Sequence, residues 1–161
     1  LLEQGAVNYE AFEYSKELLK LKEESAAFTQ VENPVRDQGF RRAIVSLYDH
    51  RCAICGIRML TPSGHTIVDA SHIKPWSESF DDHPSNGLCL CKLCHWSFDE
   101  GIVGIDTKYQ VLVSPIAKAD TNIPGHILTF HHRPIFYPTQ DEFMPGQGNI
   151  KWHRKKKFAR T

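Results

Sequence analysis

The chain has 161 residues, of which 41% are hydrophobic and 24% charged, enough for one domain with a core of its own. Lys and Arg together number 19, as do Asp and Glu, so the net charge indicates neither nucleic acid nor membrane as a partner. No run approaches the roughly 20 apolar residues that a membrane-spanning helix requires. The first residues lack the basic and apolar regions of a secretory signal. We therefore expect a cytoplasmic protein.

The N-terminal part of the sequence has the pattern of helices. Apolar residues between positions 8 and 30 recur among Glu and Lys, which predicts an amphipathic helix. Asn33-Pro34 is expected to end it, because the residue before a proline avoids helical backbone angles. A second helix is predicted over residues 40–48. We divide the chain into an N-terminal helix, residues 1–34, that serves as a linker or dimerisation element, and a domain over residues 35–161.

Strands and helices alternate in the remainder of the chain. Residues 65–73 (HTIVDASHI) are rich in β-branched side chains, which predicts a strand. A polar loop over residues 74–87, a short strand at 88–90 and a helix at 91–99 follow. Further strands are predicted at 102–105, 109–113, 127–130 and 135–137, and a last helix at 149–158. This order predicts an α+β fold with a β-rich C-terminal extension.

Four of the five cysteines form two C-x-x-C pairs, Cys52 with Cys55 and Cys91 with Cys94. Two such turns can surround one ion with four thiolates, a shell that favours structural Zn²⁺ and leaves it no open position. The odd number of cysteines and their pairing indicate a metal site in a reducing compartment rather than a disulfide framework. Cys89 lies outside the pattern and is expected in the core.

Polar residues beside these cysteines suggest a second site. His72 lies near the end of the predicted strand, and Asn86 precedes the next one. His95 and Asp99 are four residues apart on a predicted helix, so their side chains share one face and can hold a divalent ion. Cys94 points about 100° away around the same helix, which can therefore serve two metals on two sides. Taken singly, each residue is equally consistent with a surface or turn position.

Together, the segments DASHIKPW at 69–76, SNGLCLC at 85–91 and CHWSFDEG at 94–101 resemble the three parts of an HNH endonuclease. They are most similar to the branch found in bacterial restriction and other defence nucleases. The similarity covers residues 40–106 strongly and the tail more loosely. It implies a ββα-metal core with zinc knuckles, and hydrolysis of DNA phosphodiester bonds in restriction or anti-phage defence.

The resemblance also implies roles for individual residues. His72 would be the catalytic base that activates water, and Asn86 would brace the loop and orient His72 through backbone hydrogen bonds. His95 would bind the catalytic ion, Mg²⁺ or Mn²⁺, with Asp99 as a second ligand. A neutral imidazole is suited to take a proton from water at physiological pH.

The sequence departs from the family pattern at one position. Many relatives have Asp or His directly before the catalytic histidine, where that residue binds the metal, whereas this chain has Ser71. Asp69 lies two residues earlier on the same strand face and is a candidate substitute ligand.

Contacts to DNA are expected from positive charges that face the phosphates, independently of base sequence. The candidates are Arg41, Arg42, Lys74 and the cluster at 151–157, within it Lys155 and Lys156. Because the net charge is zero, we expect targeting to come from a sensor domain outside this chain or from a partner in a homodimer. The main alternative is a non-catalytic zinc module that binds nucleic acid or protein. A zinc hydrolase of small molecules is disfavoured, because a four-sulfur ion has no open position.

Overall fold

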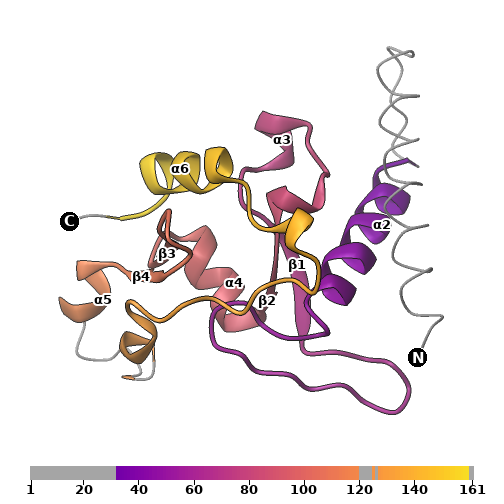
Figure 1. Cartoon of the computed structure of the whole chain (residues 1–161), viewed down its shortest axis with the longest axis horizontal. Coiled ribbons are helices and arrows are strands. Elements are labelled where there is room, and N and C mark those ends of the chain that lie inside the picture. Colours follow the sequence, from indigo (N-terminus) through magenta and orange to yellow (C-terminus); the bar gives the residue numbers. More distant parts are fainter. Residues whose placement is uncertain (1–31, 120–124, 126, 160–161) are drawn as a thin grey trace.

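The computed structural model describes residues 32–119, 125 and 127–159 (Figure 1). The helix predicted over residues 8–30 lies outside these residues. At the centre stand two antiparallel strands, β1 (Val68–His72) and β2 (Gly87–Cys91), paired from Val68 opposite Cys91 to His72 opposite Gly87. Helix α4 (Lys92–Asp99) follows β2 without a break. β1, β2 and α4 thus form the predicted ββα unit, confirming the mixed fold class.

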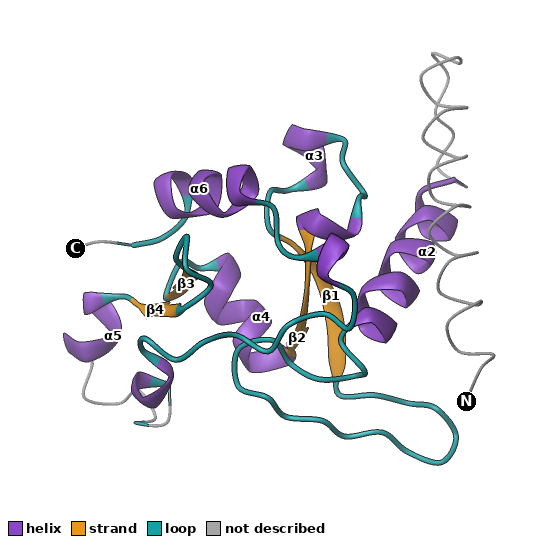
Figure 2. Cartoon of the chain, in the orientation of Figure 1, coloured by secondary structure: helices purple, strands orange, loops and turns teal. Residues whose placement is uncertain are grey.

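Helix α2 (Glu32–Leu47) packs on the β1–β2 hairpin, opposite α4 (Figures 1 and 2). Its apolar face buries Phe40 and Ile44 so close to β2 that a Cβ on Gly87 would lie 2.3 Å from Ile44 Cδ1. The predicted break at Asn33-Pro34 is wrong. Pro34 lies in the first turn of α2, where a missing backbone N–H costs no helical hydrogen bond. The boundary proposed after residue 34 therefore falls inside α2.

The connection from β1 to β2, predicted as a polar loop, contains two short helical turns, α3 (Trp76–Ser79) and η1 (Pro84–Asn86). Phe80 ends α3 with a left-handed backbone, φ 50°. This connection passes over the end of β1 and brings its own side chains next to His72, which determines the site described below.

The C-terminal part contains β3 (Val103–Ile105) and β4 (Val111–Val113), which pair antiparallel, followed by α5 (Pro115–Ala119), η2 (Leu128–Phe130), η3 (Asp141–Phe143) and α6 (Gln147–Lys156). The strands predicted at 127–130 and 135–137 are wrong: the first is the 3₁₀ turn η2. Residues 135–137 form no strand and make isolated hydrogen bonds near β4, such as Ile135 N to Tyr109 O at 2.9 Å. The extension is therefore less β-rich than predicted.

From these segments, Ile127, Phe130 and Ile135 are nevertheless buried in one core that continues from α2 through the hairpin to β3 and β4. Within the residues that the structure describes, no helix is both long and apolar enough to cross a membrane. Helix α6 contacts β3 and closes the side of the molecule on which α4 ends (Figure 1).

Candidate active site and metal centre

The four paired cysteines meet on one side of α4. Cys52 and Cys55 lie in the turn after α2, and Cys91 and Cys94 lie at the start of α4. Their sulfur atoms all lie within 4.8 Å of one another, and Cys55 Sγ is 3.7 Å from Cys91 Sγ. A tetrahedral zinc with Zn–S bonds of about 2.3 Å requires sulfurs roughly 3.8 Å apart. The cysteines therefore fit a structural metal ion.

The electrostatics of this cluster agree with a metal site. Hydrogen bonds from neighbouring thiols, that of Cys52 foremost, lower the pKa of Cys91 and bring the pKa of Cys55 to about 7. The same contacts raise the pKa of Cys52 and Cys94, so four thiolates together need a cation to balance their charge. Burial raises the pKa of the Cys89 thiol, which lies outside the cluster as a neutral core residue.

A second site lies on the other side of α4, in a cavity of about 540 Å³. Its walls come from β1, the β1–β2 connection, α4 and α6. The cavity is lined by polar and aromatic side chains, among them His72, Trp76, His95, Asp99, His153 and Lys157. The cavity thus brings together three of the residues expected at a catalytic site, and adds residues of α6 that were not expected there.

His72 is the last residue of β1 and is held from two directions. Its ring stacks on Phe40 of α2, with centroids 3.9 Å apart and planes at 7°. Its Nε2 lies 2.8 Å from Oδ1 of Asp82, whose side chain is 0% exposed. The second carboxylate oxygen of Asp82 lies 3.3 Å from Nε of Arg36. Sequence reasoning missed Asp82 and Arg36, because their approach to His72 depends on how the β1–β2 connection and α2 pack together.

Asn86 is fully buried and joins the two ends of the β1–β2 connection. Its Oδ1 accepts a hydrogen bond from Lys74 N at 2.9 Å, and its Nδ2 donates to Lys74 O at 3.0 Å and to Asp81 O at 2.9 Å. Its backbone oxygen accepts from Ile73 N at 2.9 Å. Asn86 therefore holds the residues that follow His72 and the residue that precedes Asp82, consistent with the bracing role expected of it.

His95 and Asp99 lie one turn apart on α4, with His95 Nε2 3.4 Å from Asp99 Oδ2. Burial raises the pKa of Asp99, and the nearby positive charges of His95 and Lys157 oppose this rise. One imidazole nitrogen and one carboxylate suit a divalent cation that keeps positions for water and phosphate oxygens. The donor chemistry of this pair fits the implied catalytic ion.

Asp69, the candidate substitute ligand, does not line the cavity. Its carboxylate contacts Arg41 Nε at 2.7 Å and Lys92 Nζ at 3.5 Å. Burial acts to raise the pKa of Asp69, but a hydrogen bond from Ala70 N and the charge of Arg41 outweigh it and lower the pKa. Ser71 does line the cavity, and its buried hydroxyl has no hydrogen-bond partner among the described residues.

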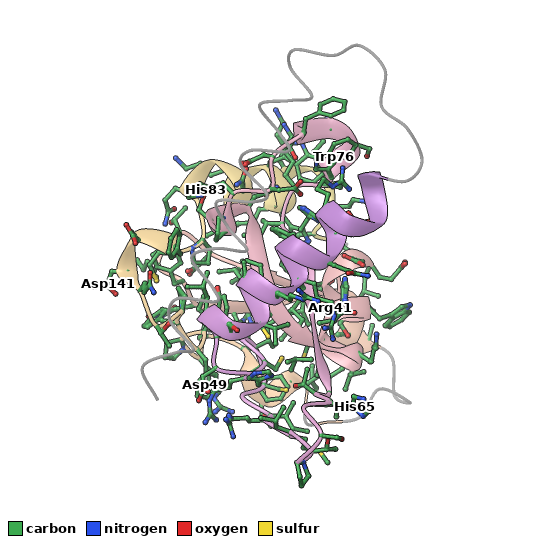
Figure 3. The ribbon with its side chains drawn as sticks, turned by 90° about the vertical axis from the view of Figure 1, so that its right-hand side faces the viewer. Arg41, Asp49, His65, Trp76, His83 and Asp141 are labelled. Atoms are coloured by element: carbon green, nitrogen blue, oxygen red, sulfur yellow. The ribbon has the colours of Figure 1, made fainter. Side chains whose placement is uncertain are left out.

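The basic candidates for DNA contact are spread over the surface. Arg41 lies partway along α2 (Figure 3), engaged with Asp69. Arg42, Lys155 and Lys156 are exposed and lie outside the cavity, as does Lys74. Lys157, directly after α6, is the member of the C-terminal cluster that lines the cavity.

His153 lines the cavity and connects α6 to α4. Its ring stacks on Phe98 with centroids 3.7 Å apart, and its Nε2 donates to Phe98 O at 2.9 Å. Burial lowers the pKa of His153 to about 4, so the ring is neutral near pH 7. This histidine has a structural environment, unlike the partly exposed His72.

The architecture is a ββα core with a four-cysteine site on one side of its helix and a histidine-lined cavity on the other. Residues 52–106 match the family model described as HNH endonuclease. This segment runs from the first cysteine pair through the hairpin and α4 to the end of β3, and so includes both sites.

Two solved structures are similar to the chain. The modification-dependent restriction endonuclease TagI is 24% identical, with a TM-score of 0.54 over 81% of this chain and 43% of that one. The type IV phosphorothioation-dependent restriction endonuclease ScoMcrA is 21% identical, with a TM-score of 0.45 over 56% of this chain and 18% of that one. The chain thus spans less than half the length of TagI, and the likeness to TagI shows a shared fold. No curated protein matches the sequence.

Proposed function

We propose that the chain is the nuclease part of a restriction or anti-phage defence enzyme that hydrolyses DNA phosphodiester bonds with a divalent ion. The observation that carries this proposal is the cavity in which His72 faces the same space as His95 and Asp99. The match of residues 52–106 to the HNH endonuclease family model supports a nuclease role for that segment. A four-cysteine zinc module without catalysis would not require this second group of polar residues.

In the proposed reaction, His72 removes a proton from a water molecule, and the oxygen of that water forms a bond to phosphorus. The bond from phosphorus to the 3′ oxygen breaks, which leaves a 5′-phosphate and a 3′-hydroxyl once that oxygen has gained a proton. His95 and Asp99 would hold Mg²⁺ or Mn²⁺, which when bound supplies positive charge to the phosphate and the leaving oxygen. Zn²⁺ would occupy the cysteine site and stabilise the fold.

Asn86 and Lys157 support this chemistry in different ways. Asn86 fixes the backbone on which His72 is carried. Lys157 brings an ammonium group to the cavity wall, near Asp99, where it can pair with a phosphate oxygen. Because this chain has no net charge to attract DNA, we assign DNA recognition to another part of a longer protein or to a second copy of the chain.

The test is cleavage of a supercoiled plasmid with Mg²⁺ or Mn²⁺, beside an EDTA control and the variant His72→Ala. His65→Ala is the matched control, since His65 is exposed on the loop before β1 and does not line the cavity (Figure 3). We expect nicking or linearisation that requires the divalent ion and His72 but not His65. Cleavage by His72→Ala at the wild-type rate would refute the assignment. A zinc-loaded, folded protein that binds DNA without cutting it would favour the non-catalytic module.

A further inference from the structure

We propose that Asp82 is a positioning residue that keeps the proton of the neutral His72 ring on Nε2, so that Nδ1 is the atom that receives the proton from water. The inference rests on the proposed nuclease function and specifies how its base is prepared. It uses Asp82 of the β1–β2 connection and Arg36 of α2, two residues to which the resemblance assigned no role.

The hydrogen bond between Asp82 and His72 determines which ring nitrogen of His72 carries the proton. An ionised carboxylate can only accept hydrogen bonds, so a contact of 2.8 Å from Asp82 Oδ1 to His72 Nε2 requires the proton on Nε2. Arg36 places a permanent positive charge beside this carboxylate, with its Nε 3.3 Å from Oδ2. The guanidinium is itself held over the ring of Trp76, 3.8 Å from its centroid, close to the start of α2 (Figure 3).

The remaining ring nitrogen is the one available for chemistry. His72 lines the cavity with a side chain that is 21% exposed, and no hydrogen bond to its Nδ1 is present among the described residues. The stack on Phe40 fixes the plane of the ring, and the contact with Asp82 fixes its rotation in that plane. A neutral imidazole with Nε2 protonated presents a lone pair on Nδ1, as a general base requires.

Asn86 helps to hold His72 and Asp82 in a fixed position relative to each other. Its side chain forms hydrogen bonds with the backbone of Lys74, two residues after His72, and of Asp81, one residue before Asp82. The same side chain therefore holds the chain next to both residues. When water loses a proton to Nδ1, the ring becomes a cation beside the Asp82 carboxylate, which stabilises it. The hydroxide formed attacks phosphorus, and the imidazolium later returns its proton to solvent or to the leaving oxygen.

The tautomer can be measured directly, without turnover. We would record long-range ¹H–¹⁵N correlations of the histidine rings in the zinc-loaded chain at alkaline pH, and assign His72 from the signals missing in His72→Gln. The expected result is protonated Nε2 and unprotonated Nδ1. A neutral His72 with its proton on Nδ1, or with the two tautomers equally populated, would overturn the proposal whether or not the protein cuts DNA.

The test by activity compares Asp82→Asn with Asp49→Asn, since Asp49 also pairs with an arginine, Arg58, but at an exposed position that does not involve His72. We expect Asp82→Asn to lower kcat about 100-fold with KM nearly unchanged, and to abolish the tautomer preference. Asp49→Asn should alter neither. An unchanged kcat in a folded Asp82→Asn protein would also refute the positioning role. If Asp82→Asn does not fold, the wild-type tautomer decides. An inactive wild type with protonated Nε2 would count against the nuclease function and not against the orientation of the ring.

Discussion

Two histidines at the same cavity differ in what their rings contact. His72 has its Nε2 against a buried carboxylate, and the residue lines the cavity. His153 donates to a backbone carbonyl of Phe98 and lies buried against the ring of that residue. For His153, burial opposes protonation more strongly than the hydrogen bond to Phe98 O favours it, so the pKa is lowered. The first environment suits acid–base chemistry and the second suits packing.

The environment of His153 predicts a pH dependence of stability. Its pKa is lowered from 6.5 to about 4 by burial, so between these values the unfolded chain binds a proton that the folded chain does not. The free energy of unfolding must then fall as the pH drops below 6.5, by up to about 3 kcal/mol at pH 4. Urea unfolding of wild type and His153→Gln from pH 7 to 4 measures this. The glutamine keeps an N–H for Phe98 but does not titrate.

We expect the stability difference between these two proteins to move in favour of His153→Gln by about 3 kcal/mol on acidification. Loss of zinc in acid affects both proteins and cancels in the comparison. A difference that stays constant with pH would show that the ring titrates alike in the folded and unfolded chains.

At the scale of elements, α4 connects the two sites because adjacent residues point in different directions around a helix. Cys94 reaches the sulfur cluster and His95 reaches the cavity, about 100° apart. Loss of the zinc should therefore disturb the start of α4 and, through it, the position of His95. The structural site would then support catalysis without touching substrate.

This dependence is tested by Cys94→Ser beside Cys89→Ser. We expect Cys94→Ser to lose zinc, melt at a lower temperature and show no cleavage, because a thiolate ligand is removed. Cys89→Ser should keep its zinc and its activity, at a stability cost of about 1–3 kcal/mol for the buried hydroxyl. Elemental analysis and thermal melts measure both effects. Equal zinc loss in the two variants would contradict the assignment of Cys89 to the core.

The elements that the sequence predicts well are those with local signals. The strand before His72, the helix carrying His95 and Asp99, and the cysteine pairs all follow from spacing over a few residues. The link from Asp82 to His72 depends on how a 14-residue connection folds back over β1. Apolar content at 127–130 predicted a strand, but the segment contains a 3₁₀ turn that buries Ile127 and Phe130 and leaves Leu128 exposed. Tertiary packing determines the structure at both places, and no pattern of neighbouring residues in the sequence indicates that packing.

At the scale of the whole molecule, charge is balanced overall but not locally. The chain has no net charge, and basic residues gather in α2 and at the end of α6 besides scattered positions such as Lys74 and Lys92. An electrostatic attraction to DNA therefore depends on which of these residues stand near the cavity. The described part places Lys157 at the cavity, whereas Lys155 and Lys156 face solvent away from it.

Lys157→Ala and Lys155→Ala separate a charge at the site of reaction from a charge on the surface. With its ammonium at the cavity wall, Lys157 should act on the phosphate that is attacked, and its loss should lower kcat at saturating DNA by about tenfold or more. Lys155→Ala should leave kcat unchanged and weaken DNA binding at most a few-fold, with a smaller salt dependence. Single-turnover cleavage and binding titrations over a range of salt concentrations measure the two effects. If both variants lose only affinity, by equal amounts, then Lys157 is one more surface charge, and the phosphate at the cavity is neutralised by the ion on His95 and Asp99 without help from α6.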